Sequence, residues 1–226
     1  HACDITQERD LSALLNDLRA SGPLKGIVHA AMVLDDALLA NLTVERSAPV
    51  IDVKVKGAEN LHRLTLQDDL ELFLLFSSAT TLIGNPGQAN YVLGNGYLEG
   101  LARVRRAAGL PALAVGFGAI ADAGYLTRHT DVNELLAKRI GKSAMKAKDA
   151  LNHVEAYMRC DPGTVSSSVV AIADIDWNAV RLLPVSQTAY LDMAGRGDKD
   201  GHLSDESDTI DLEELIRGRT QDEAYQ

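Results

Sequence analysis

The chain alternates between short apolar runs and longer segments in which apolar residues recur every three or four positions. Apolar runs typical of buried strands cover residues 25–31, 70–76, 110–117 and 165–175. Helical spacing covers residues 10–20, 44–66, 90–108 and 143–159; Pro49 and Gly57 interrupt the second of these, and Ser143 is the expected N-cap of the last. Alternating strands and helices are typical of βαβ units, so we expect an α/β fold with a parallel sheet and helices on both faces.

In an open parallel sheet, ligands bind beyond the carboxyl ends of the strands. The positions at the predicted strand ends are Asp4, residues 29–31, residues 77–78 and residues 116–119. Most of them are small, which lets a flat ligand approach the backbone. We interpret His29 as a packing residue and not as a base. The sequence therefore predicts the functional site at this edge of the sheet.

Composition and charge narrow the class of protein. The 226 residues are 46% hydrophobic and carry a net charge of −10, which is typical of a globular protein that repels nucleic acids and anionic lipid surfaces. No apolar run approaches the roughly 18 to 20 residues needed to cross a membrane. The two cysteines, Cys3 and Cys160, lack metal-ligand spacing, so we expect neither a metal site nor a disulfide framework, and a cytoplasmic location.

The two ends of the chain indicate that it belongs to something longer. It opens at His1 without a methionine, which we interpret as a cut from a larger protein. We expect one core over residues 1–194. Residues 195–226 then form an acidic linker and a short helix that lead toward a neighbouring module.

Four polar residues form a candidate catalytic set. Ser78 ends a predicted strand, and Tyr91 follows thirteen residues later at the start of a helix that carries Asn95 one turn further on. A serine and a tyrosine hydroxyl can stabilise an alkoxide that forms from a ketone, and the phenol can supply the proton. An ammonium group lowers a phenol pKa from about 10, and Lys54 is the candidate. Each of these residues, taken alone, is more often structural than catalytic.

Four motifs carry a family resemblance: residues 29–36 (HAAMVLDD), 54–61 (KVKGAENL), 75–78 (LFSS) and 87–95 (GQANYVLGN). Over residues 4–177 the chain strongly resembles the ketoreductase domains of modular type I polyketide synthases, which belong to the short-chain dehydrogenase/reductase superfamily. The resemblance implies a Rossmann-like, doubly wound parallel sheet that lacks its first βα units, because no Gly-rich phosphate-binding turn is found.

The resemblance also implies roles for the site residues. Tyr91 would protonate the β-keto oxygen, Ser78 would donate to it, and Asn95 would support a water-linked proton relay. Lys54 would contact the nicotinamide ribose and depress the pKa of Tyr91, and NADPH would supply the hydride. The residues implied to line the cofactor, besides Lys54 and Tyr91, are Asp4, Ile5, Ala30, Ala31, Phe117, Gly118 and Ala119.

Substrate and stereochemistry follow from the same resemblance. Leu34, Asp35 and Asp36 match the motif that accompanies B-type reduction to the D-configured hydroxyl, although two acids before Ala-Leu-Leu are also typical of a helix N-cap. Gln88 and Leu126 would contact the substrate, and residues 122–141 would form a lid. The implied partners are an acyl carrier protein bearing a phosphopantetheine-linked β-ketoacyl chain and the neighbouring synthase domains.

The leading hypothesis is therefore NADPH-dependent reduction of a β-ketoacyl group on an acyl carrier protein to the β-hydroxyacyl group. The alternatives are a non-catalytic half-domain that scaffolds a synthase, and the ketoreductase of a fatty acid synthase.

Overall fold

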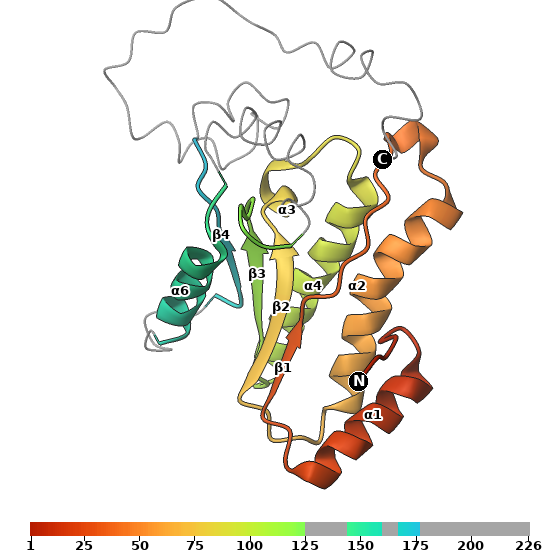
Figure 1. The fold of residues 1–226 in the computed structure, drawn as a ribbon, viewed down its shortest axis with the longest axis vertical. Coiled ribbons are helices and arrows are strands. Elements are labelled where there is room, and N and C mark those ends of the chain that lie inside the picture. The colour runs from red at the N-terminus through yellow and green to blue at the C-terminus, as the bar shows by residue number, and fades with distance from the viewer. Residues whose placement is uncertain (125–143, 160–166, 177–226) are drawn as a thin grey trace, which may run out of the picture. The chain divides into compact units, whose positions relative to one another are not determined.

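The computed structural model describes residues 1–124, 144–159 and 167–176, which lie almost entirely in one compact unit of the chain (Figure 1). The predicted domain boundary after residue 194 and the predicted lid, beyond residue 124, lie outside the described residues. The elements are α1 (Glu8–Ser21), β1 (Gly26–His29), the 3-10 helix η1 (Leu39–Asn41), α2 (Val44–Leu64), β2 (Leu72–Ser78), α3 (Thr80–Ile83), α4 (Ala89–Ala107), β3 (Leu113–Phe117), α6 (Ala147–Met158) and β4 (Val169–Ile172).

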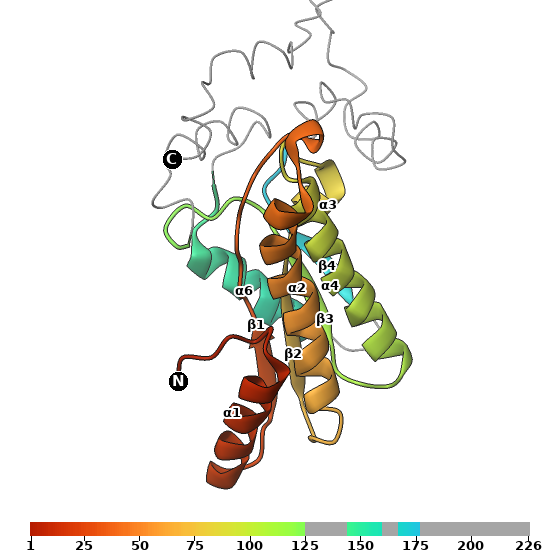
Figure 2. The same cartoon turned by 90° about the vertical axis from the view of Figure 1, so that its right-hand side faces the viewer.

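The strands form a four-stranded sheet in the order β1-β2-β3-β4, and every neighbouring pair is parallel. Helices α2 and α4 cover one face of the sheet and α6 covers the other (Figures 1 and 2). The predicted parallel α/β sheet with helices on both faces is confirmed. Because the strands are parallel, the carboxyl ends of β1, β2 and β3 lie at one edge.

Alternation along β2 divides the core into two clusters. Phe73 and Leu75, both fully buried, belong to the cluster that also contains residues of α1, α2 and α4. Leu74 belongs to the second cluster with Val154 of α6. Successive side chains of a strand point to opposite faces, so a strand covered on both sides is apolar throughout, as the run 70–76 predicted.

Several element boundaries differ from the predictions. Strand β2 continues through Ser78, and α6 begins at Ala147 with Lys146 as N-cap, whereas the predicted cap, Ser143, lies outside the described residues. The Ala147 amide instead donates to Asp122 Oδ1 at 2.7 Å, a contact across 25 residues that no local pattern reveals. Helix α2 runs unbroken through Pro49, and its residues Ala58 and Leu61 pack into the first core cluster with Phe73 and Leu75 of β2.

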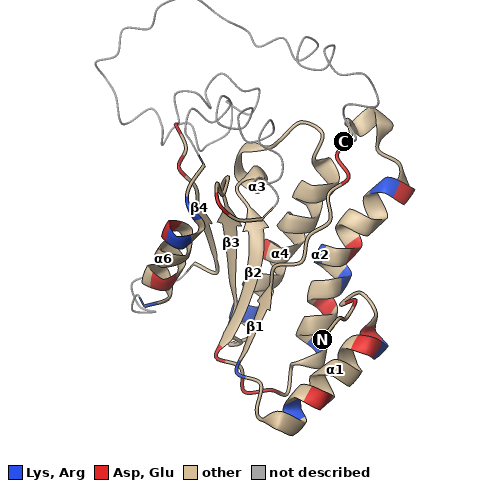
Figure 3. Ribbon diagram, viewed as in Figure 1, with Lys and Arg blue, Asp and Glu red and all other residues tan. Residues whose placement is uncertain are grey.

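Acidic and basic side chains are interleaved on α1, α2 and α6, and few lie on the strands (Figure 3). Many are paired, for example Arg63 with Glu8 and Lys56 with Asp52. Exposed pairs of this kind contribute little stability, about 0 to 1 kcal/mol each. Among the described residues, no helix is long and apolar enough to span a membrane and no three metal-binding side chains gather.

Candidate active site

The end of β2 and the start of α4 bring three of the four predicted catalytic residues together. Ser78 is the last residue of β2 and is 8% exposed. Tyr91 is the third residue of α4 and is partly buried, and Asn95, one turn further on, is completely buried. Both Ser78 and Asn95 lie close enough to Tyr91 for their side chains to lower its pKa through hydrogen bonding.

Lys54 joins this group from α2. Its side chain is buried between α2 and α4, with 2% of the residue exposed, and its ammonium group lies 5.7 Å from the centre of the Tyr91 ring. Nζ donates to the carbonyl oxygen of Phe76 at 2.7 Å. Burial lowers the pKa of Lys54 to about 8, because the charged ammonium group loses solvation. The predicted convergence of Lys54, Ser78, Tyr91 and Asn95 is therefore observed.

The predicted depression of the Tyr91 pKa is wrong for the chain as it stands. Burial raises this pKa above its ordinary value, and the negative charge of Asp36 raises it further, whereas hydrogen bonding to Asn95 and Ser78 lowers it in part. The Lys54 ammonium group lies over the Tyr91 ring and donates a hydrogen bond to the Phe76 carbonyl oxygen. The physical reason is desolvation, which disfavours the phenolate and which spacing along the sequence does not reveal.

The hydrogen bonds of the site leave two polar groups for a ligand. Ser78 Oγ accepts from the Thr80 amide at 3.2 Å and from the Thr80 hydroxyl at 2.9 Å, so the serine's own hydrogen can be donated to Tyr91 or to a ligand. Asn95 Nδ2 donates to the Tyr91 carbonyl oxygen at 2.9 Å. Asn95 Oδ1 is buried without a hydrogen-bond partner among the described residues. Buried polar groups are normally paired, so this oxygen points to a group that completes the site.

The loop that contains Asp35 and Asp36 is held beside Tyr91 by an ion pair and hydrogen bonds. The Asp35 carboxylate makes a two-pronged ion pair with Arg46, whose Nη2 also donates to the Asp36 carbonyl oxygen at 2.8 Å. Gln88, directly before α4, donates from Nε2 to Asp36 Oδ2 at 2.9 Å. No helix begins at Asp35 or Asp36, so the N-cap interpretation is wrong. The acids thus hold this loop against the start of α4.

Around Leu34 the same loop has further support. Leu34 is partly buried, and the Ala37 amide donates to the Gly87 carbonyl oxygen at 2.8 Å. The buried Asn90 donates from Nδ2 to the Asp35 carbonyl oxygen at 2.9 Å and accepts the Tyr91 amide at 2.8 Å. Asn90 thus links the acidic loop directly to the tyrosine.

Two predicted cofactor residues, Asp4 and Ile5, lie ahead of α1. No strand precedes Asp4 among the described residues, which corrects that prediction; its carboxylate instead accepts from the Thr6 amide and hydroxyl, and these bonds lower its pKa. The Ile5 side chain fills the notch at Gly57, where an added Cβ would lie 2.6 Å from Ile5 Cδ1. Ile5 therefore packs against α2, and Asp4 remains exposed.

The other predicted cofactor residues follow β1 and β3. Ala30 is exposed and Ala31 partly buried, directly after His29. The Phe117 ring packs on Phe76 with centroids 4.8 Å apart, so this ring belongs to the second core cluster. Gly118 packs closely against the residue that follows β4, since an added Cβ would lie 2.7 Å from Ala173 Cβ, and Ala119 comes next in the chain. Leu126 lies outside the described residues.

These residues fit the nicotinamide end of a dinucleotide. Hydroxyl groups, an ammonium group, the unpaired Asn95 oxygen and small residues after β1 and β3 meet at one edge of the sheet. A pyrophosphate cradle, in contrast, is not seen in the described part of the chain, where no strand leads through a Gly-rich turn into a helix. The site described here therefore accounts for one half of such a ligand.

Sequence reasoning missed four polar residues that hold the site. They are Arg46, Thr80, Asn90 and Glu99, each of which bonds to a predicted site residue or to its immediate neighbour. Asn90 lies inside the quoted GQANY motif, so its position was a usable signal. The other three are polar residues on helices, and nothing in their spacing distinguishes them from solvated side chains.

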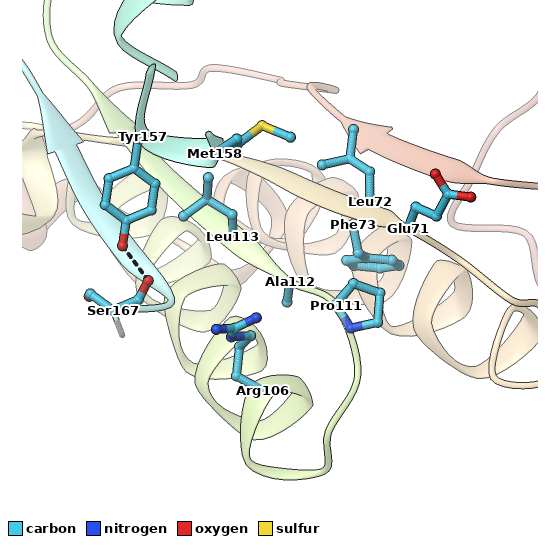
Figure 4. A pocket seen from close by; sticks show the side chains of 10 residues that line it. All are labelled: Glu71, Leu72, Phe73, Arg106, Pro111, Ala112, Leu113, Tyr157, Met158 and Ser167. Carbon is cyan, nitrogen blue, oxygen red and sulfur yellow. Dashed lines mark hydrogen bonds between the residues drawn. The ribbon is translucent and has the colours of Figure 1, made fainter. Parts of the chain in front are cut away.

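Two further features are not part of the candidate site: the buried His29 and a cavity at the other end of the strands. His29 is 2% exposed, and burial followed by the charge of Lys54 lowers its pKa to about 4. A neutral, buried imidazole agrees with the predicted packing role. A cavity of about 170 Å³ lies at the opposite, amino-terminal end of β2 and β3, where Phe73, Arg106 and Tyr157 line it (Figure 4). It contains none of the predicted site residues.

A Rossmann-like sheet with serine, tyrosine and lysine side chains at its carboxyl edge defines an oxidoreductase of the short-chain dehydrogenase type. The family profile of the KR domain matches residues 1–122, and the chain belongs to this family, the ketoreductase domains of polyketide synthases. It is similar to the polyketide synthase GfsA of Streptomyces halstedii, with 41% identity over 176 residues, which are 78% of this chain and 2% of GfsA.

A second polyketide synthase and a solved ketoreductase structure are also similar to this chain. The phenolphthiocerol synthesis polyketide synthase type I Pks15/1 of Mycobacterium marinum is 39% identical over 161 residues, which are 70% of this chain and 8% of that protein. A solved structure described as A-type ketoreductases from a modular polyketide synthase is similar with a TM-score of 0.73 and 33% identity, over 80% of this chain and 37% of that one. The chain thus spans little more than a third of that solved ketoreductase.

Proposed function

We propose that this chain carries the ketone-reducing site of an NADPH-dependent β-ketoacyl reductase that acts during polyketide chain extension. The observation that supports this most strongly is the meeting of Ser78, Tyr91 and Lys54 at the carboxyl edge of a parallel sheet. Two hydroxyl groups that point to one place, backed by a buried ammonium group, suit a ketone oxygen that becomes an alkoxide.

Tyr91 is the proton donor in this proposal. Its raised pKa keeps the phenol protonated near neutral pH, which is the state that an acid must start from. As the ketone oxygen gains negative charge, the phenol hydrogen passes to it and the carbonyl becomes an alcohol. The Lys54 ammonium over the ring then stabilises the phenolate that remains.

Ser78 and Asn95 act around that transfer. The Ser78 hydroxyl, whose oxygen accepts two bonds from Thr80, donates its hydrogen to the same ketone oxygen when substrate is bound and so orients it. The unpaired Asn95 Oδ1 holds a water molecule that returns a proton toward Tyr91. The role of Asn95 follows from a buried oxygen that has no partner among the described residues.

The cofactor in this proposal is NADPH, which when bound supplies the hydride for the carbonyl carbon. Lys54 and Tyr91 would hold its ribose. The small residues Ala30 and Ala31 leave room for the nicotinamide beside them.

The substrate is proposed to be a β-ketoacyl chain on an acyl carrier protein, and the product to be the D-configured alcohol. The support is the loop of Leu34, Asp35 and Asp36, which is bonded to Gln88 and so forms one wall beside Tyr91. A wall fixed in this way presents one face of the ketone to the cofactor.

The test measures NADPH consumption with a β-ketoacyl thioester, using the native polypeptide that carries this chain. Replacing the phenol in Tyr91→Phe should lower kcat by about 10² to 10⁴, as expected for the loss of a general acid. Tyr97→Phe, on the same helix but more exposed, is the matched control and should stay within about twofold of the parent. A Tyr91→Phe variant within about threefold of the parent would contradict the proposal.

Chiral chromatography of the product tests the stereochemical part separately. The D-alcohol is expected, and a predominant L-alcohol would overturn the role given to the acidic loop while leaving ketone reduction intact.

A further inference from the structure

Glu99 lies beneath the candidate site, on the same helix as Tyr91 and Asn95. It follows Asn95 by four residues, which is one helical turn, and its side chain is 14% exposed. Among the described residues, it forms an ion pair with Arg103, whose Nη2 is 3.9 Å away, at the limit of such a pair. The carboxylate is therefore mostly covered and is bound by groups other than a strong counter-charge.

Two hydroxyl groups donate to one oxygen of this carboxylate. Ser77 Oγ lies 2.8 Å and Thr81 Oγ1 lies 2.7 Å from Glu99 Oε1. Ser77 directly precedes Ser78 in β2, and Thr81 follows Ser78 by three residues in α3. One carboxylate oxygen thus holds the chain on both sides of the serine.

The turn between these two points is also bonded within itself. The Thr81 hydroxyl also lies 2.8 Å from the Ser78 carbonyl oxygen, so its single hydrogen is shared between that oxygen and Glu99, and Thr80 donates to Ser78 Oγ. These bonds fix the shape of the turn, and Glu99 joins it to α4 through two hydrogen bonds, in addition to the packing of β2 on α4. The carboxylate therefore helps to set the position of Ser78 relative to Tyr91.

We propose that Glu99 is a positioning residue that sets the distance between the Ser78 hydroxyl and Tyr91 by binding Ser77 and Thr81. The inference rests on the proposed ketone reduction, for which both hydroxyl groups must reach one oxygen. A carboxylate suits the task because each of its oxygens can accept two hydrogen bonds, and charged acceptors bind about twice as strongly as neutral ones.

The kinetic test uses Glu99→Gln, which keeps the size of the side chain but removes its charge. We expect kcat to fall about tenfold with KM little changed, because a small displacement of a catalytic group slows the reacting step more than it weakens substrate binding. If Glu99 acts through Ser78, the same change in a Ser78→Ala background should cause no further loss. Unfolding in urea checks that both variants are folded.

The matched control is Glu155→Gln, which also removes a glutamate paired with an arginine four residues away but lies on α6. It should stay within about twofold of the parent. An unchanged kcat in Glu99→Gln, or an equal loss with and without the Ser78 hydroxyl, would overturn the positioning role.

A second measurement needs no turnover and keeps the net charge. In the double variant Ser77→Ala with Thr81→Val, both donors to Glu99 are gone while every carboxylate remains. Ser78 lowers the pKa of Tyr91, so a displaced Ser78 should raise it. An ultraviolet titration of tyrosinate, with Tyr91→Phe subtracted, reads this pKa.

The expected result is a Tyr91 pKa above the parent value in the double variant, in the same direction as in Ser78→Ala. An unchanged pKa would overturn the positioning role. If the parent protein reduces no β-ketoacyl thioester, the proposed function fails, and the titration still decides whether Glu99 places Ser78 beside Tyr91.

Discussion

Gly94 lies where α4 passes the stem of Lys54, and an alanine there should displace the candidate site's ammonium group. An added Cβ would lie 3.0 Å from Lys54 Cβ and 3.2 Å from Lys54 Cγ, both closer than ordinary van der Waals contact. Lys54 is 2% exposed and its Nζ is bound to the Phe76 carbonyl oxygen at 2.7 Å. The stem therefore has little freedom to move without loosening that bond.

The magnitude follows from two opposing effects. Alanine is favoured over glycine inside a helix by about 1 kcal/mol, which by itself would stabilise the variant. Extra volume in a packed interior costs about 1 to 3 kcal/mol. Gly94→Ala should therefore range from neutral to about 2 kcal/mol destabilising.

Gly96→Ala is the matched control because Gly96 lies in the same helix and nothing lies within 4 Å of its added Cβ. It should stabilise the protein by about 1 kcal/mol. The assay is urea unfolding of both variants, with equal m-values required for the comparison. If Gly94→Ala stabilised the protein as much as Gly96→Ala, the close packing of Lys54 against α4 would be refuted.

Two further predictions concern the buried ionisable residues Arg105 and His29. Arg105 is 1% exposed, stacks 3.8 Å from the centre of the Phe73 ring and is bonded to His62 Nδ1 at 2.8 Å, so Arg105→Lys should lower the free energy of unfolding by about 2 to 3 kcal/mol in urea. Because burial lowers the pKa of His29 to about 4, unfolding releases an imidazole that binds protons more readily. Stability should be greatest above pH 6.5 and fall by up to about 3 kcal/mol toward pH 4. His29→Gln should flatten that dependence, and an unchanged slope would contradict it.

Much of the fold could be predicted from local pattern. The apolar run of β2 and the helical spacing of α4 predict their elements to within two residues at each end. A strand buried on both faces and a helix buried on one face have different apolar periodicities. The start of α6 could not be predicted in this way. Its first amide is bonded to Asp122, and a contact across 25 residues leaves no local signal.

The candidate site, too, could be predicted from the sequence only in part. The spacing of Ser78, Tyr91 and Asn95 placed them correctly, since a strand end and the first turns of a helix fix where side chains lie. The direction of the Tyr91 pKa was not predictable, because it depends on how much solvent the folded chain removes and on the charge of Asp36. The sequence read alone also gave no reason to choose Glu99 from among the acidic residues.

What the sequence by itself determined is the kind of chemistry and the order of the parallel elements, because residue types and their periodicity are local properties. Tertiary structure alone decided the ionisation of those groups and the bonds that hold them. Desolvation and the contact between Lys54 and Gly94 arise only when separate helices and strands pack together. The same is true of the hydrogen bonds that Ser77 and Thr81 donate to Glu99.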